Sequence, residues 1–312
     1  MSARANDNQG RGRIEFIKKA PIFGAISFVL VLISIGLIAM KGFNYGIDFS
    51  GGTEVQVRFA EPVQVEQIRA FTDSLGLKKA TVQSFGEKNE FLIRIETVQG
   101  KTQAETNALV NATVKKITTG LSEKFKGAEL RKVDTVGPQI GAELRTNGLL
   151  AIFYSLIMIL IYVGFRFDFQ FAPGAVICLF HDAILTLGVF AFLQREVNIQ
   201  TLAAILTIIG YSLNDTIVNF DRVRENIPLF KKKPLDFIVN RSVNEVLSRT
   251  ILTSVTTLLA VLCLFVLGRG VIRDLAFTLA IGVVVGTYSS IYVASPLTIF
   301  FDKLMMGSKK AA

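Results

Sequence analysis

Charged and polar side chains interrupt the long apolar stretches of this sequence, and a carboxylic acid among them could bind and release a proton. If residues 208–222 are helical, Asp215, Asn219 and Arg222 fall at i, i+4 and i+7 and form one polar stripe. A charge inside an apolar span is costly unless it is paired or hydrated, so Asp215 is a functional candidate. The nearby Asn214 could equally be an interhelical packing contact, as could Asn219.

Arg249 stands at the start of the next apolar run, at a depth similar to that of Asp215. Asp215 is about sixteen residues from the outer end of its span, or roughly 24 Å, which predicts a place in the cytoplasmic half. Arginine stays charged, whereas an aspartate that loses its cationic partner in apolar surroundings takes up a proton. The two residues could therefore form a proton switch. An arginine that only snorkels from a helix end would give the same pattern.

His181 and Asp182 lie about ten residues into another apolar run. Adjacent residues on a helix point about 100° apart, so we expect these two side chains not to share one partner. His181 is the single histidine of the chain and could be a hydrogen-bonded packing residue. Either residue, and Asp182 in particular, could belong to a proton relay.

Motifs for covalent or cofactor chemistry are missing from the sequence. It has no nucleophile elbow, phosphate loop, zinc-ligand spacing or dinucleotide fingerprint, so it predicts no enzyme, no metal and no cofactor. Gly46–Gly52 is rich in glycine, but no helix follows it to present a phosphate site, and we interpret it as a tight turn. Cys178 and Cys263 lie in apolar runs, which indicates packing residues and no disulfide framework.

The composition is that of a chain that packs its helices in lipid: 51% of the 312 residues are hydrophobic and the mean hydropathy is +0.47. Six apolar runs are long enough to cross a bilayer, the first at 21–40 and the others within 148–302, at about 149–165, 171–193, 199–220, 250–268 and 275–301. The fold class is therefore an α-helical polytopic membrane protein. A cleaved signal peptide is the alternative for the first run. Its length and the lack of a small-x-small site before Lys41 favour an uncleaved span.

The formal net charge of +9 is gathered in short clusters beside the apolar runs, which favours membrane topology over nucleic-acid binding. The connection 221–249 and the tail 303–312 are basic, whereas 194–198 and 269–274 are more balanced. Six spans put both termini on one side, and the positive-inside rule makes that side, including the tail 1–20, cytoplasmic.

Residues 41–147 differ from the rest and predict a small α+β domain. Strands are expected at 53–59, 81–85, 91–98 and 129–136, and helices at 65–75 and 102–125, the second interrupted or weakened near Gly120; residues Gly86–Asn89 favour a turn. The order β-α-β-β-α-β is that of a ferredoxin-like unit. Because the loop after the first span faces away from the cytoplasm, we expect this domain in the periplasm.

Several segments together resemble the SecF branch of the SecD/SecF family, the bacterial protein-export proteins of the RND superfamily. The matching segments follow the family's order from residue 46 to 254, which makes the set specific. They are Gly46-Ile47-Asp48-Phe49 with Gly51-Gly52, Val136-Gly137-Pro138 with Gly141 and Glu143-Leu144, Tyr162-Val163 with Arg166-Phe167, His181-Asp182, Gly210–Val218, Phe220-Asp221-Arg222 through Asn226, Ser248-Arg249-Thr250, and Thr253-Ser254.

The resemblance implies six spans that form half of an RND-type transporter, with SecD as the other half. It also implies use of the proton-motive force to help secretory polypeptides cross the bacterial inner membrane after SecA and the SecYEG channel begin the transfer, with YajC as a further partner. In the family, Asp215 and Arg249 belong to the proton pathway at the SecD–SecF interface, to which we add Asp182 and Asn214. The pathway also needs a carboxylate from SecD.

Two alternatives stay open at this point. A drug or lipid exporter of the same superfamily usually carries both halves in one chain with larger periplasmic domains, which argues against that function. A membrane scaffold that only binds partners has no reason to place Asp182 and Asp215 inside apolar spans.

Overall fold

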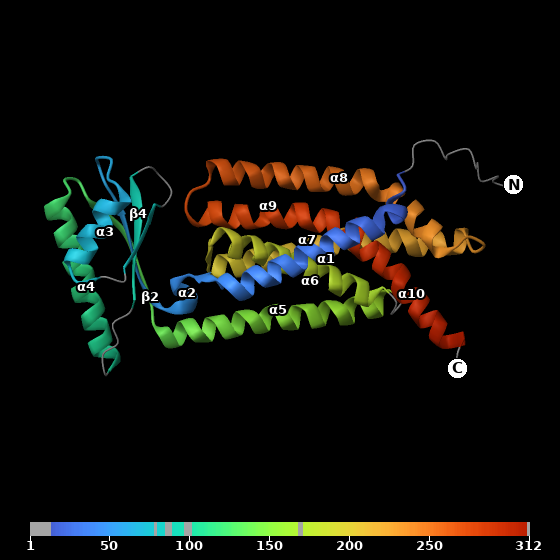
Figure 1. Ribbon diagram of the computed structural model, residues 1–312, viewed down its shortest axis with the longest axis horizontal. Helices are drawn as coiled ribbons and strands as arrows, with labels where there is room; N and C mark the ends of the chain where they lie inside the picture. The colour runs from blue at the N-terminus through green and yellow to red at the C-terminus, as the bar shows by residue number, and fades with distance from the viewer. Residues whose placement is uncertain (1–13, 78–79, 85–88, 97–101, 168–170, 311–312) are drawn as a thin grey trace.

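In the part of the chain that the structure describes, six long helical spans run side by side and make up the larger part of the fold (Figure 1). The computed structural model describes residues 14–77, 80–84, 89–96, 102–167 and 171–310. Each span is long and apolar enough to cross about 30 Å of hydrocarbon, so the predicted six-span fold is confirmed. The spans are α1 (Phe16–Lys41), α5 (Pro138–Arg166), α6 (Ala172–Leu193), α7 (Ile199–Leu229), α8 (Leu235–Leu267), and α9 (Val271–Ser289) continued by η1 (Ser290–Ala294) and α10 (Ser295–Lys310).

A four-stranded antiparallel sheet with two helices forms a small domain at one end of the spans (Figure 1). The strand order β3-β4-β2-β5 and the β-α-β-β-α-β sequence of elements confirm the predicted ferredoxin-like domain. The two helices cover one face of the sheet, and the opposite face, which carries no helix, is turned toward the spans. The elements are β2 (Gly52–Arg58), α3 (Val65–Ser74), β3 (Thr81–Ser84), β4 (Glu90–Ile95), α4 (Gln103–Lys124) and β5 (Glu129–Val136).

The core of this small domain lies between the sheet and its two helices. Alternate residues of the central strands point into it, among them Val55, Val57 and Ile93, and they meet Ile68 of α3 and Ile117 of α4. All five are at most 2% exposed, so the period-two pattern of the strands is satisfied on this face.

A second, two-stranded sheet joins the small domain to the spans. In it, β1 (Asn44–Tyr45) pairs in parallel with β6 (Glu196–Val197), and the four-residue helix α2 (Ile47–Ser50) follows β1. The prediction of a simple tight turn at Gly46–Gly52 is therefore wrong. Strands of two residues give too short a pattern to recognise in a sequence.

The helices begin and end at other places than the apolar runs suggest. The predicted connection 221–249 is wrong, because α7 continues to Leu229 and α8 begins at Leu235. Charged residues of this region pair across the two helices, which allows both to extend past the apolar stretch. Likewise α5 takes the last ten residues of the predicted domain 41–147, since Pro138 suits the first turn of a helix.

Two further expectations fail for local reasons. The helix α4 runs unbroken through Gly120, where a Cβ atom would lie 2.8 Å from Cζ of Phe71, so the glycine makes room for α3. The predicted span 275–301 is interrupted by the π-helical turn η1, and its helix continues through residue 310 of the predicted tail. Of the predicted turn Gly86–Asn89, residues 86–88 lie outside the described residues, as do residues 1–13 of the N-terminal tail.

Helix α7 lies among α6, α8 and α9, and glycine residues of α9 allow α9 to pack closely against α7. A Cβ atom at Gly286 would lie 3.1 Å from Cβ of Ser212, and one at Gly282 would overlap the side chain of Ile208. Small residues at helix contacts are typical of membrane bundles, because they bring backbones and short polar side chains together. This approach positions the polar residues of the site.

Candidate functional site

Asp182 lies at the middle of α6 and is completely buried. Its Oδ2 accepts hydrogen bonds from Ser212 Oγ on α7 at 2.5 Å and from Ser289 Oγ on α9 at 2.8 Å. A carboxylate in a low-dielectric interior needs such donors, and the two serines supply them from two neighbouring helices. Asp182 is therefore the point where α6, α7 and α9 are joined by polar contacts.

His181 contacts its neighbour directly. Its Nδ1 lies 2.8 Å from Asp182 Oδ1, so the two adjacent side chains bond to each other instead of pointing to separate partners. The imidazole stacks on the ring of Tyr288 with centroids 6.4 Å apart, and the Tyr288 hydroxyl donates to the carbonyl of Phe23. Its Nε2 is buried without a partner among the described residues.

Asp215 belongs to a second polar cluster, which α7 forms with α8 and α9. It is 3% exposed, and the described residues give its carboxylate one hydrogen-bond donor, Ser254 Oγ of α8, at a long 3.4 Å. Ser254 in turn accepts from Tyr211 at 3.1 Å, and Thr287 of α9 lies 2.7 Å from it. The carboxylate of Asp215 is thus buried with few partners.

Arg249 and Asn214 are exposed on the surface of the chain, on α8 and α7. Among the residues that the structure describes, no ion pair within 4 Å joins Arg249 to Asp215. The contact of Asp215 with α8 is made by Ser254, five residues after Arg249, so the two charged residues lie on adjoining helices without pairing. The structure also leaves Arg249 accessible to groups outside this chain.

The rest of the predicted polar stripe contacts different helices. Asn219 donates from Nδ2 to the carbonyl of Ser290 at 3.3 Å, where the π-helical turn η1 exposes a backbone oxygen. Arg222 binds Glu245 of α8 at 2.7 Å, and Glu245 also accepts from Asn226 at 2.8 Å. Asp221, by contrast, is half-buried beside these contacts, and the structure brings it into none of them.

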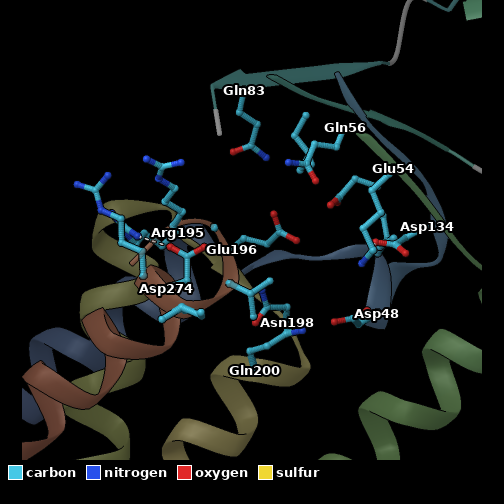
Figure 2. Close-up of a pocket in the computed structure, with 18 of the residues that line it drawn as sticks. Asp48, Glu54, Gln56, Gln83, Asp134, Arg195, Glu196, Asn198, Gln200 and Asp274 are labelled. Carbon is cyan, nitrogen blue, oxygen red and sulfur yellow. Dashed lines mark hydrogen bonds and ion pairs between the residues drawn. The ribbon is translucent and has the colours of Figure 1, made fainter. Parts of the chain in front are cut away.

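A cavity of about 1020 Å³ lies between the sheet of the small domain and the ends of the spans (Figure 2). Its upper wall in the figure is the helix-free face of the sheet, from which Gln83, Gln56 and Glu54 project. Asn198 and Gln200 project from the opposite wall, at the start of α7. The cavity therefore has walls from both parts of the chain.

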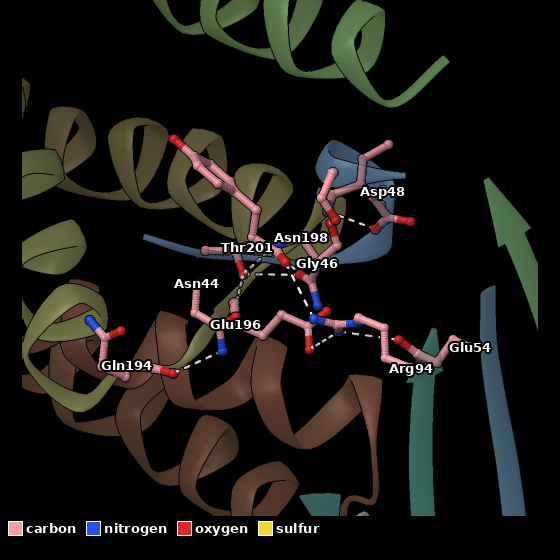
Figure 3. Close-up of polar contacts among 12 residues, drawn as sticks. Asn44, Gly46, Asp48, Glu54, Arg94, Gln194, Glu196, Asn198 and Thr201 are labelled. Atoms are coloured by element: carbon pink, nitrogen blue, oxygen red, sulfur yellow. Dashed lines mark hydrogen bonds and ion pairs between the residues drawn. The ribbon is translucent and has the colours of Figure 1, made fainter. Parts of the chain in front are cut away.

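Arg94 of β4 connects the two parts at the edge of this cavity (Figure 3). Its guanidinium binds Glu196 of β6 at 2.5 Å and Glu54 of β2 at 3.2 Å, and it donates to the carbonyl of Tyr45 in β1 at 3.3 Å. We call Arg94, Glu54, Glu196 and Tyr45 the junction cluster. It holds the four-stranded sheet against the two-stranded sheet that precedes α7.

Burial and neighbouring charges shift the pKa of two residues of the junction cluster, Glu54 and Arg94. Burial raises the pKa of the Glu54 carboxyl above its ordinary value, and the negative charge of Glu196 raises it further, while Arg94 opposes both. Burial alone would lower the pKa of the Arg94 guanidinium, but the two carboxylates outweigh it and raise that pKa. Arg94 therefore stays charged and stabilises two carboxylates that would otherwise repel.

The glycine-rich segment predicted as a family motif fixes the start of two spans. Asp48 accepts from the backbone N–H of Ile199 at 3.1 Å, which satisfies a free donor at the N-terminus of α7. Gly51 has a φ of +72°, and a Cβ there would lie 2.8 Å from Cα of Pro138, while one at Gly141 would lie 2.9 Å from the Gly51 nitrogen. The segment therefore packs tightly against the first turn of α5.

The other motif glycines and Glu143 divide into packed and exposed positions. A Cβ at Gly46 would overlap the carboxylate of Glu196, and one at Gly52 would lie 3.0 Å from the carbonyl of Ile95. Gly137 is the residue before α5 and has open space around it, and Glu143 is exposed on that helix. The first two therefore serve the junction, whereas nothing in the structure explains the last two.

Some residues of the site were not identified from the sequence. Ser289 was missed because a serine in an apolar span gives no signal by itself, although it follows Gly286 by three residues on the same helix face. Arg94 and Glu196 were missed because they are about a hundred residues apart in sequence, and only the pairing of β1 with β6 brings them together.

Comparison with known proteins places the chain in a family. A family model described as "Protein export membrane protein SecD/SecF, C-terminal" matches residues 115–304, more than half of the chain, and the "SecD/SecF GG Motif" model matches residues 36–63. The chain belongs to the SecD/SecF family. The glycine motif covers α2 and β2, and the C-terminal model covers the second to sixth spans and thus Asp182 and Asp215.

Members of this SecD/SecF family resemble the chain along most of its length. The protein translocase subunit SecF of Magnetococcus marinus is 48% identical over 280 residues, which cover 89% of each chain, and that of Desulfurispirillum indicum is 43% identical, with 92% of this chain and 91% of its own covered. The crystal structure of SecDF, a translocon-associated membrane protein from Thermus thermophilus, superposes with a TM-score of 0.83 at 39% identity over 94% of this chain. A super-membrane-facing form of SecDF gives a TM-score of 0.69 at 38% identity, covering 96% of this chain. The chain spans 39% and 40% of those two SecDF chains.

Proposed function

We propose that this chain is the SecF-type half of a membrane transport complex that uses the proton-motive force to assist the export of secretory polypeptides. Its other half is SecD, which supplies the second set of spans and a further carboxylate. The complex acts after SecA and SecYEG begin the transfer, with YajC as an additional partner. The chain transports and does not catalyse a covalent reaction.

The observation that carries this proposal is the state of Asp215. It is 3% exposed at the middle of α7, and the described residues offer it one long hydrogen bond and no ion pair. A buried carboxylate with so few partners is costly when charged, so a proton or an outside cation must compensate it. Arg249 stands nearby on the exposed surface of α8, where a SecD carboxylate can compete for it.

A switch follows from this competition. When Asp215 is charged it attracts Arg249, and when it is protonated Arg249 is released to the SecD side. Each alternative favours a different packing of the two sets of spans. One elementary charge that crosses 100 mV supplies about 2.3 kcal/mol, which is enough to shift such an equilibrium about fiftyfold.

The contacts at the start of α7 support a route from this switch to the small domain. Asp48 binds the first residue of α7, and β6, immediately before α7, pairs with β1 and holds Arg94 through Glu196. A shift of α7 therefore moves the sheet of the small domain with it. The buried carboxylates and this coupling favour a transporter over a scaffold that only binds partners.

The distribution of charge supports an orientation in the inner membrane. The start of α1, the end of α10 and the connection between α7 and α8, which carries Lys231, Lys232 and Lys233, lie at one end of the spans, opposite the small domain (Figure 1). By the positive-inside rule that end is cytoplasmic. The small domain is then periplasmic, on the side where an exported polypeptide emerges.

Asp215→Asn tests the proposal. The amide keeps the shape of the side chain but cannot carry a proton, so proton-stimulated export by the SecD-containing complex in vesicles is expected to fall to the rate without a gradient. The matched control is Asp236→Asn, because Asp236 lies half exposed in the first turn of α8 and pairs with Lys303. If Asp215→Asn exported as fast as the unmodified complex under a gradient, the proton role of Asp215 would be excluded.

A further inference from the structure

We propose that the cavity between the four-stranded sheet and the spans holds an extended segment of the exported polypeptide. The inference rests on the proposed function, which brings an unfolded secretory chain to this side of the membrane. It adds the place where that chain is held and the side chains that hold it.

The cavity is large enough for several residues of extended chain. Its volume of about 1020 Å³ is at the upper end of the range for sites that enclose drug-sized ligands, about 300–1,000 Å³. One wall is the helix-free face of the sheet (Figure 2), and the other is made by the start of α7 and by the turn between α8 and α9, which includes Gly270. An occupant would therefore touch both the small domain and the spans.

The sheet face presents its side chains to the cavity in register. Because side chains alternate along a strand, Val55 and Val57 of β2 fill the core while Gln56 points to the cavity. Across the strands, Gln56 is opposite Leu92 of β4, and Leu92 is opposite Gln83 of β3. The two glutamines thus lie in one row across the sheet.

Three glutamine side chains that line the cavity have no hydrogen-bond partner within the described part of the chain: Gln56 and Gln83 from the sheet, and Gln200 from α7. Figure 2 shows Gln83 and Gln56 facing Gln200 across the space. A side-chain amide carries both donors and an acceptor, as a peptide group does. Free amides on opposite walls can therefore bind the backbone of an extended chain whatever its sequence.

The other side chains that line the cavity do not favour an ion, a lipid or a drug-like molecule as the ligand. Six carboxylates and four cationic side chains line the cavity, and the pairs Arg195–Asp274 at 2.7 Å and Lys132–Asp134 at 2.6 Å already neutralise part of them. Neither an anion nor a cation is strongly preferred by such a wall, and no three His, Cys, Asp or Glu side chains of the described residues are grouped to hold a metal ion. Of the 25 lining residues 17 are charged or carry an amide or hydroxyl, whereas lipid and drug sites are mostly apolar.

Site-specific photocross-linking tests the proposal. A photoreactive phenylalanine analogue is placed at Gln83 or Gln200 in the full complex with SecD, and the probe is a reduced and alkylated secretory precursor carrying a fluorophore. The control position is Arg69, which is exposed on α3 behind the same sheet. We expect about tenfold more adduct at the two cavity positions, because binding raises the local concentration of the chain there. Unlabelled unfolded precursor, and not a folded protein, should compete.

Equal or greater adduct at Arg69, or no adduct at Gln83 and Gln200, would overturn the proposal. A second variant, Gln83→Leu with Gln200→Leu, should weaken binding of the same probe about tenfold through the loss of two hydrogen-bonding groups, with an unchanged unfolding temperature. Undiminished binding by that variant contradicts the assignment.

The two proposals fail separately. Cross-linking needs no proton gradient, so adducts at Gln83 together with full export by Asp215→Asn would refute proton coupling and leave the cavity occupied. Proton-stimulated export without adducts in the cavity would refute the cavity alone.

Discussion

Replacing Arg94 by glutamine should loosen the small domain from the spans. The change removes the only guanidinium of the junction cluster and its contacts with Glu54, Glu196 and the carbonyl of Tyr45. It also leaves two partly buried carboxylates facing each other without a cation. Glutamine still fills part of the space, so the effect is mainly electrostatic.

The size of the effect follows from how far the cluster is shielded from water. The side chains of Arg94, Glu54 and Glu196 are 13%, 17% and 22% exposed. Breaking a fully buried ion pair costs about 3–5 kcal/mol, and an exposed pair contributes about 0–1 kcal/mol. We therefore expect about 2–3 kcal/mol for Arg94→Gln, or roughly a 30- to 150-fold shift toward the separated arrangement.

Hydrogen exchange measures this shift at a single amide. The N–H of Gly46 donates to the carbonyl of Val197 at 2.9 Å, next to the two-stranded sheet, so its protection reports the junction. In Arg94→Gln the protection of the Gly46 amide from exchange should fall roughly 30- to 150-fold, while the amide of Val55 in the sheet core serves as an internal reference. The control is Arg131→Gln, which removes an exposed pair with Glu129 on the same sheet and should change protection by less than about fivefold.

Two outcomes would refute the reasoning. One is unchanged protection of Gly46 in Arg94→Gln, and the other is an equal loss in Arg131→Gln. A double-mutant cycle of Arg94→Gln with Glu196→Gln adds a direct measure, because a true pair gives a coupling energy different from zero.

The remaining predictions concern pH and the glycine segment. Because the pKa of Glu54 in the folded chain lies above its ordinary 4.5, the folded state binds a proton that the unfolded chain releases, and stability falls as pH rises from 4.5 through the folded pKa. Glu54→Gln should abolish this decline, as calorimetric unfolding across that range would show; a persisting decline would assign it to another group. Gly51→Ala should destabilise the chain by about 2–4 kcal/mol, from a strained positive φ and contact with the α5 backbone. Gly76→Ala, at a φ of +84° with open space around it, should cost only about 1–2 kcal/mol, and equal unfolding temperatures for the two variants would contradict the packing argument.

Much of the fold could be predicted because it rests on long patterns. The six apolar spans and the alternating strands of the small domain repeat a signal over many residues, and β5 at Glu129–Val136 has the predicted bounds. Short elements gave no such signal, so β1, β6 and α2 were missed. The ends of α7 and α8 were misplaced because helix termini there depend on charged contacts such as Arg222–Glu245, and hydropathy does not record those.

From the sequence, only those residues of the site could be predicted whose type is unusual at their position. An aspartate in an apolar span is unusual enough to identify Asp182 and Asp215 without a structure, and both prove to be buried. Their partners are ordinary serines whose importance comes from helix packing, as with Ser212 opposite Gly286. The exposure of Arg249 could not be predicted from the sequence either, because it depends on how α8 is rotated against α7.

The unbroken length of α7 makes it a lever. From Asp215 to Ile199 is sixteen residues, or about 24 Å at 1.5 Å per residue. A tilt of about 10° around Asp215 would move the end that Asp48 holds by about 4 Å, more than the length of any hydrogen bond there. The displacement grows with distance from the pivot, so the sheet beyond Arg94 would travel further still. A tilt of α7 that leaves Asp215 almost in place would thus displace the wall of the cavity by several ångströms.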